Sequence, residues 1–169
     1  TEPRAKHAKE NTRVEALFCA YSKQLGDVND RKDRLVKCSR DLTSSSKKLI
    51  FRALQSIPGA RPESEKAIST LLSMQNALLG LFVPIEKELA SAATPSQPAT
   101  AAEAKRSVYW RYHRQISPGV QEFVEAYGLL WYLREGTLVT REAVEAAVHE
   151  ALGKALGGED GSGVWATEI

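Results

Sequence analysis

Two glutamates, Glu122 and Glu125, stand three residues apart inside a stretch that is otherwise largely apolar, residues 120–133. On a helix such residues are neighbours, so their negative charges repel each other. In a partly buried position they must take up protons, pair with Arg or Lys, or bind a cation. If both carboxylates face one space, they suit Mg²⁺, which takes carboxylates together with water and substrate phosphate. The chemistry would then be metal-assisted hydrolysis of a phosphodiester.

The polar residues of this stretch form one narrow stripe on an ideal helix. With Gln121 set at zero, Glu122 lies near ~100° and Glu125 near ~40° around the helix axis. Gly128 lies beside them at about −20° and would leave room for a ligand or an ion. The other faces of the helix are apolar, which predicts that the helix is buried.

A structural role for the two acids is the alternative. Ser117 is a good N-cap and Pro118 suits the first helical position, so a helix is expected to begin at Ser117. The acids would then lie near the positive end of their helix or pair with Arg111 or Arg114. Because the E-x-x-E pattern is common on helices, the pattern alone does not decide between the two roles.

A basic stretch, residues 31–52, holds eight Lys and Arg residues and two Asp residues, a net charge of +6. Helical geometry places Lys37, Arg40 and Lys47 within about 80° of one another, with Ser44 among them. Cations flanked by hydroxyls suit phosphate contacts, so we predict that these three residues bind nucleic acid. The alternative is a solvated helix face.

A second cluster interleaves rings and cations over residues 109–114, "YWRYHR". Aromatic and cationic side chains together can stack and clamp single-stranded bases, which makes Arg111 and Arg114 candidate nucleic-acid contacts. On a helix the same pattern also fits an amphipathic face whose rings are buried.

Composition and motif content bound the remaining possibilities. The 169 residues are 43% hydrophobic and 26% charged, which is typical of one soluble globular domain, and the net charge of +2 does not by itself indicate a nucleic-acid partner. Cys19 and Cys38 form no disulfide framework and indicate reduced thiols in an intracellular protein. No run approaches the ~18 apolar residues of a membrane span. No phosphate-binding glycine loop, CxxC or HExxH occurs, so any catalysis should come from carboxylates.

The pattern predicts a very long first helix, residues 12–57, which contains no proline before residue 58 and one glycine. Its apolar residues alternate steps of four and three, as in a coiled-coil or bundle seam: Val14, Phe18, Tyr21, Leu25 and Val28. One row continues as Leu35, Leu42 and Leu49, and the other becomes small or polar. A helix of about 70 Å must extend along partner helices, of this chain or of another subunit.

Helices are expected in most of the remaining chain, which makes the fold class all-α, a helical bundle. A flexible basic tail, residues 1–11, precedes a single helical domain, residues 12–169. The second helix runs over residues 63–90, where Pro84 marks a kink or an end, and a surface linker follows at 91–103.

The last predicted helix has start and stop signals of its own. It begins after Thr140, with Glu142 in its first turn, Lys154 near its end and Gly157 as C-cap. Its buried stripe is expected to comprise Val144, Val148, Leu152 and Leu156. A glycine-rich linker at 157–163 should lead into a further element, so the chain is expected to lack a C-terminal portion.

Three segments resemble the translin family, and within it the TRAX branch. They are "LVKCSRDLTSSSKKLIF" at 35–51, "RQISPGVQEFVEA" at 114–126 and "GTLVTREAV" at 136–144. The matches occur in the order of the family. The resemblance implies a helical subunit that assembles with translin into a closed hetero-oligomeric shell in the cytoplasm and nucleus.

The same resemblance implies a function. The shell would bind single-stranded RNA, and single-stranded DNA as a second ligand, and would cut RNA with Mg²⁺ in RNA silencing or tRNA processing. TRAX is the catalytic subunit of the family, and its acidic-helix glutamates fall on Glu122 and Glu125 of this sequence.

One departure from the family is evident. The active site of the family also uses an Asp and a Glu four residues later, in a "DLTGE"-like motif that this sequence lacks. We therefore expect this chain to carry half of the acidic site and to be inactive alone. The alternatives are a non-catalytic nucleic-acid-binding or scaffold subunit that assembles with translin, and a helical interaction protein without nucleic acid.

Overall fold

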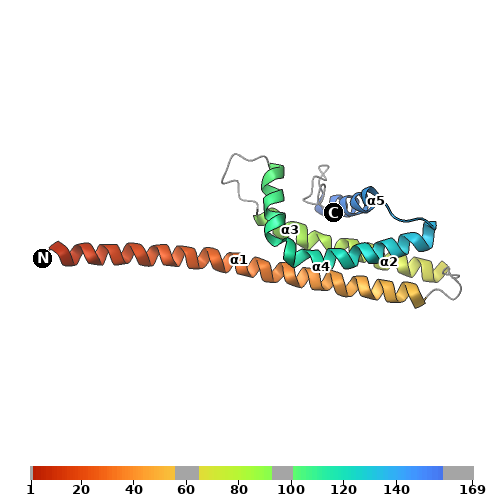
Figure 1. The fold of residues 1–169 in the computed structure, drawn as a ribbon, viewed down its shortest axis with the longest axis horizontal. Coiled ribbons are helices and arrows are strands. Elements are labelled where there is room, and N and C mark those ends of the chain that lie inside the picture. Colours follow the sequence, from red (N-terminus) through yellow and green to blue (C-terminus); the bar gives the residue numbers. More distant parts are fainter. Residues whose placement is uncertain (1, 56–64, 93–100, 158–169) are drawn as a thin grey trace. The chain divides into compact units, whose positions relative to one another are not determined.

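The computed structural model describes residues 2–55, 65–92 and 101–157, with the side chains of 12–55, 66–92 and 106–157. These residues form five α-helices (Figure 1), namely α1 (Glu2–Gln55), α2 (Glu65–Gly80), α3 (Phe82–Ala92), α4 (Ala101–Glu135) and α5 (Arg141–Leu156). The described parts contain no strand. The predicted all-α class and the very long first helix are confirmed. Helix α1 begins ten residues before the predicted start at residue 12, inside the segment expected to be a flexible tail.

The chain divides into two compact units, Thr1–Arg34 and Leu35–Ile169. In the first unit, every described side chain from Thr12 to Asp30 is exposed. The second unit holds the rest of α1 and the other four helices. The prediction of one domain over residues 12–169 stays a prediction, and the linkers expected at 91–103 and 157–163 lie largely outside the described residues.

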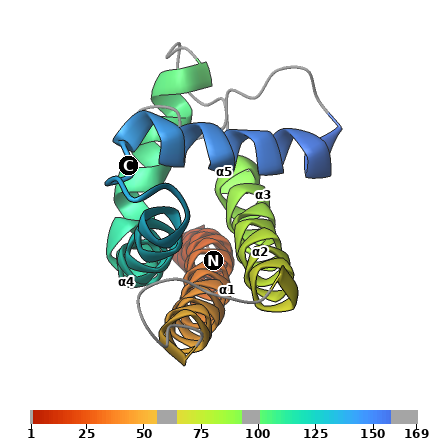
Figure 2. The ribbon, with the colours of Figure 1, turned by 90° about the vertical axis from the view of Figure 1, so that its right-hand side faces the viewer.

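The second unit is built on the apolar row of α1. Leu35, Leu42 and Leu49 are all 0% exposed, and the small row beside them, Ser39, Ser46 and Ala53, is buried as well. Figure 2 shows this part of α1 next to α2 and α4, with α5 across α2 and α3. Small residues let a neighbouring helix approach closely, so both rows of the seam face the core.

The predicted second helix is two helices. The break lies at Leu81, whose N–H donates to the Leu78 carbonyl at 3.1 Å, and Pro84 falls in the first turn of α3. The N–H groups of the first turn of a helix have no partner within that helix, so a proline there costs no hydrogen bond. Pro84 therefore lies at the start of a helix and does not end one. By length and mean hydropathy alone (1.5), Lys66–Ala92 could cross a membrane, contrary to the expectation that no such run exists. Two of its residues, Phe82 and Ile85, are buried in the core of this unit.

Helix α4 runs without interruption through Pro118, so the predicted helix start at Ser117 is wrong. The residues before it carry a buried helical stripe, Val108, Tyr112 and Ile116, which keeps the preceding turns helical. Figure 1 shows that α4 changes direction part-way along its length. A proline inside a helix removes one backbone hydrogen bond and causes such a bend.

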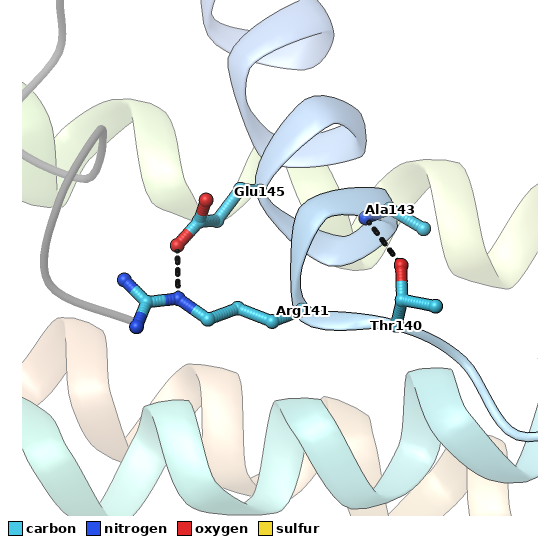
Figure 3. Close-up of polar contacts among 4 residues, drawn as sticks. All are labelled: Thr140, Arg141, Ala143 and Glu145. Atoms are coloured by element: carbon cyan, nitrogen blue, oxygen red, sulfur yellow. Dashed lines mark hydrogen bonds and ion pairs between the residues drawn. The ribbon is translucent and has the colours of Figure 1, made fainter.

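Helix α5 begins and ends where its signals predict. The Thr140 hydroxyl accepts a hydrogen bond from the Ala143 N–H at 3.2 Å (Figure 3), and Gly157 closes the helix at φ 68°, a left-handed conformation that favours glycine. Val144, Val148 and Leu152 are buried as expected. Leu156 is 45% exposed, so its place in the buried stripe is wrong.

Candidate functional site

The two predicted catalytic residues lie on the second half of α4, and the buried residues on the other faces of this helix fix their position. Phe123 is 0% exposed and its ring meets Phe82 of α3 edge-on, with the ring centroids 4.7 Å apart. Ala126 and Tyr127 are buried as well. Because these side chains fix the rotation of α4, Glu122 comes to a half-buried position and Glu125 to an exposed one.

Glu122 meets a residue that the sequence assigned to a different role. The Lys47 Nζ lies 3.1 Å from the Glu122 Oε1, and the two side chains are 63% and 24% exposed. A predicted metal ligand and a predicted phosphate contact are therefore one ion pair between α1 and α4. In the structural alternative the acids paired with Arg111 or Arg114, but for Glu122 the cation comes from the other helix.

The side chain of Glu125 has different neighbours from that of Glu122. It lines a hollow of about 410 Å³ on one side of α4, together with Tyr109, His113, Ser117, Val120, Gln121 and Val124. A Cβ on Gly128 would meet the Val139 Cγ1 at 3.6 Å, an ordinary packing contact, so Val139 bounds the space predicted beside this glycine. The room beside the acids lies at this hollow, on the N-terminal side of Glu125.

The other predicted nucleic-acid contacts lie on helix surfaces. Lys37 and Arg40 are exposed on α1, and Arg111 and Arg114 are exposed on α4. In the aromatic cluster, Tyr109 and Tyr112 are 4% and 3% exposed, whereas Trp110 is 54% exposed. The cluster thus follows the amphipathic alternative for two of its rings, and its cations remain accessible.

A contact that the sequence did not predict joins α1 to the backbone of α4 on both sides of Pro118. The buried Ser39 hydroxyl donates to the Ile116 carbonyl at 3.3 Å and accepts from the Gly119 N–H at 3.1 Å. A Cβ on Gly119 would lie 2.7 Å from the Ser39 carbonyl oxygen, so only glycine allows this approach. A serine in the buried row of α1 and the S-P-G triplet were the available signals, but nothing in the sequence pairs them.

The donor set can be compared with what Mg²⁺ requires. Among the residues whose side chains are described, no group of three or more His, Cys, Asp and Glu gathers in one place. Glu122 and Glu125, one turn apart on α4, offer the one or two carboxylates that Mg²⁺ takes when water and phosphate complete its shell. The described residues thus fit part of a magnesium site.

For two titratable groups elsewhere in the second unit, burial is the main cause of a shifted pKa. Burial raises the pKa of the Cys38 thiol, and the nearby charges of Asp41 and Glu88 raise it further. Burial also raises the pKa of the Tyr127 phenol, against the opposing effects of Arg134 and Gln75. Tyr127 lines a second hollow, of about 580 Å³, between α2, α4 and α5. Neither group contacts the two acids.

Comparison with known proteins agrees with this arrangement of helices. The sequence model of the Translin family matches residues 30–160. Translin-associated protein X of Rattus norvegicus is 27% identical over 139 residues, which cover 82% of this chain and 42% of that protein. The Mus musculus protein of the same name is 26% identical with the same coverage, so the chain spans less than half the length of these relatives. The chain belongs to the translin family.

Proposed function

We propose that this chain is a TRAX-type subunit that assembles with translin, and that the complex cuts single-stranded RNA with Mg²⁺. The observation that carries the proposal is the position of Glu122 and Glu125, side by side on the accessible face of a helix that is otherwise packed into the core. The similarity to proteins named translin-associated protein X supports the assembly.

In this proposal each charged residue has a separate task. Glu122 and Glu125 would hold Mg²⁺, which when bound supplies an activated water and screens the scissile phosphate. The exposed cations Lys37, Arg40, Lys47, Arg111 and Arg114 would neutralise the RNA backbone. Because they lie on α1 and on α4, the strand would pass over both helices. Single-stranded DNA would bind to the same cations.

The apolar row of the first unit supports assembly with another subunit. Val14, Phe18, Tyr21, Leu25 and Val28 are 37–72% exposed and repeat at coiled-coil spacing. The same register is buried from Leu35 onward. We propose that a helix of translin covers this row, and that the complex works in the cytoplasm and nucleus.

The test is cleavage of single-stranded RNA by the full-length protein co-expressed with translin, with Mg²⁺ and with EDTA. Glu122→Ala and Glu125→Ala should each lower cleavage about 10²-fold or more, since each removes a group that stabilises transition-state charge. Glu135→Ala, at the exposed end of α4, is the matched control. Full activity in both site variants would overturn the catalytic assignment.

A non-catalytic binding or scaffold subunit is the second candidate. It is favoured by the ion pair of Glu122 with Lys47 and by the lack of a third acid near the two glutamates among the described side chains. In that case RNA binding would fall steeply with salt, as for any phosphate contact, and the glutamate variants would bind RNA as tightly as the wild type or more tightly.

A further inference from the structure

Helix α4 changes direction part-way along its length (Figure 1), and we assign this bend to its internal proline, Pro118. A side chain of another helix contacts the backbone on both sides of this proline. Proline has no N–H, and its ring pushes away the carbonyl four residues earlier, so the helix loses backbone hydrogen bonds at this point. Ser39 of α1 supplies both a donor and an acceptor here, to the Ile116 carbonyl and from the Gly119 N–H. Ser39 is only 4% exposed, so water does not compete freely for these two hydrogen bonds.

The contact leaves almost no freedom in the distance between the two helices. A Cβ on Gly119 would lie 2.7 Å from the Ser39 carbonyl oxygen, 2.9 Å from its hydroxyl oxygen and 3.1 Å from its Cα. Two of the three neighbours are backbone atoms, which cannot turn aside as a flexible side chain can. The backbones of α1 and α4 therefore touch at this point.

A second contact between the same helices lies two turns further on. Lys47 is eight residues after Ser39 on α1, about 12 Å along the helix, and Glu122 is three residues after Gly119 on α4. The ion pair of Lys47 with Glu122 is accessible to water and is weak by itself. The contact at Ser39 is the buried one of the two.

We propose that Ser39 is a positioning residue, which fixes the bend at Pro118 and thereby places Glu122 beside Lys47 on the basic face of α1, with Glu125 one turn further along α4. Its consequence for catalysis rests on the function proposed above, whereas its consequence for the bend does not. Ser39 touches neither acid, so it acts through the backbone of α4.

The chain offers a matched control. Ser46 is on the same helix, seven residues later in the same row, and is 0% exposed, but its hydroxyl has no hydrogen-bond partner. Ser39→Ala and Ser46→Ala thus remove the same atom from equally buried places, and only the first removes a contact with the bend. Ser39→Cys keeps a side chain that can hydrogen-bond, with a somewhat larger atom and weaker hydrogen bonds, and it is the second variant in case Ser39→Ala fails to fold.

The first measurement is amide hydrogen exchange in the complex with translin. Exchange at Gly119 and Val120 should be about tenfold faster or more in Ser39→Ala, intermediate in Ser39→Cys and unchanged in Ser46→Ala. Equal exchange at these amides in the wild type and in both Ser39 variants would overturn the positioning role.

The second measurement is RNA cleavage by the same complexes. Ser39→Ala should lower kcat about 10–100-fold and raise the Mg²⁺ concentration needed for half-maximal rate, because small misplacements of reacting groups are costly. The KM for RNA should stay within about twofold, since the cations are untouched. A proportional loss in Ser46→Ala would mean that only general stability matters. If the wild type itself does not cut RNA, the proposed function fails, and hydrogen exchange alone still decides the role of Ser39.

Discussion

At the scale of single residues, the main finding is that two predicted roles converge on one contact. Lys47 was expected to bind phosphate and Glu122 to bind metal, and the two form an ion pair at 3.1 Å. Each therefore neutralises the other in the absence of ligands. Phosphate or a cation arriving at this place must compete with the pair, which makes Lys47 the most informative of the five candidate cations.

Replacing Lys47 separates its two contacts. Lys47→Met should cost the fold less than about 1 kcal/mol, because the ion pair is accessible to solvent. In the translin complex the variant should bind RNA more weakly and lower the slope of log Kd against log salt by about 1, the signature of one lost phosphate contact. Lys48→Met, on the next residue, is the control. An unchanged salt slope in Lys47→Met would contradict the contact.

Tyr127 makes stability depend on pH. Burial raises the pKa of its phenol above the ordinary 10.0, so the folded state favours the neutral form. This contribution is fully present below the unfolded pKa and is lost as pH rises through the higher folded pKa. In urea unfolding between pH 8 and about pH 11, the wild type should lose stability more steeply than Tyr127→Phe. Parallel pH profiles would show that Tyr127 does not titrate differently in the two states.

At the scale of helices, the ends of a helix depend on contacts between residues close in sequence, whereas a bend in its interior can depend on a contact with a distant residue. Thr140 and Gly157 define α5 through contacts within a few residues, Thr140 with Ala143 and Gly157 with Gly153. The bend of α4 depends on Ser39, 80 residues before Gly119. This is why the limits of α5 could be predicted from the sequence, whereas the contact at the bend of α4 could not.

The cap of α5 can be tested by substitution. Thr140→Ala removes the acceptor for the Ala143 N–H and should lower the free energy of unfolding by about 1 kcal/mol, whereas Thr140→Ser should keep most of it. Thr137→Ala, exposed and outside the helix, is the control. Urea denaturation followed by circular dichroism measures all three, and equal losses in Thr137→Ala and Thr140→Ala would rule out a capping contribution.

At the scale of the whole molecule, one helix serves two units. The apolar register of α1 is buried from Leu35 to Leu49 and exposed from Val14 to Val28. Exposed apolar rows of this size are typical of interaction surfaces rather than of free surfaces. Assembly should therefore depend on the first unit, whereas the stability of the second unit's core should not depend on it.

A charge in the exposed row tests this division. Leu25→Asp should reduce co-purification with translin at least about tenfold, since it places a charge in an apolar contact, and should leave the unfolding of the second unit unchanged. Ala16→Asp, on the opposite face of the same helix, should assemble normally. Normal assembly of Leu25→Asp would show that translin binds elsewhere.

The sequence by itself determined the all-α class, the presence of a very long first helix, the seam from Leu35 to Leu49 and both ends of α5, but not the start of α1, which lies ten residues before the predicted one. These follow from periodicity, caps and the absence of helix breakers, all of which act over a few residues. It also singled out Glu122 and Glu125 by their polarity among apolar neighbours.

Only the tertiary structure decided what surrounds these residues. Val139 lies against Gly128, Lys47 pairs with Glu122, and Ser39 holds the bend at Pro118. Each of these contacts joins residues that are distant in sequence or that lie on different elements, and a helical pattern specifies which face is buried but not which atom of another helix meets it. The face that carries the acids was thus readable in the sequence, whereas its neighbours were fixed by the way α1 and α4 pack.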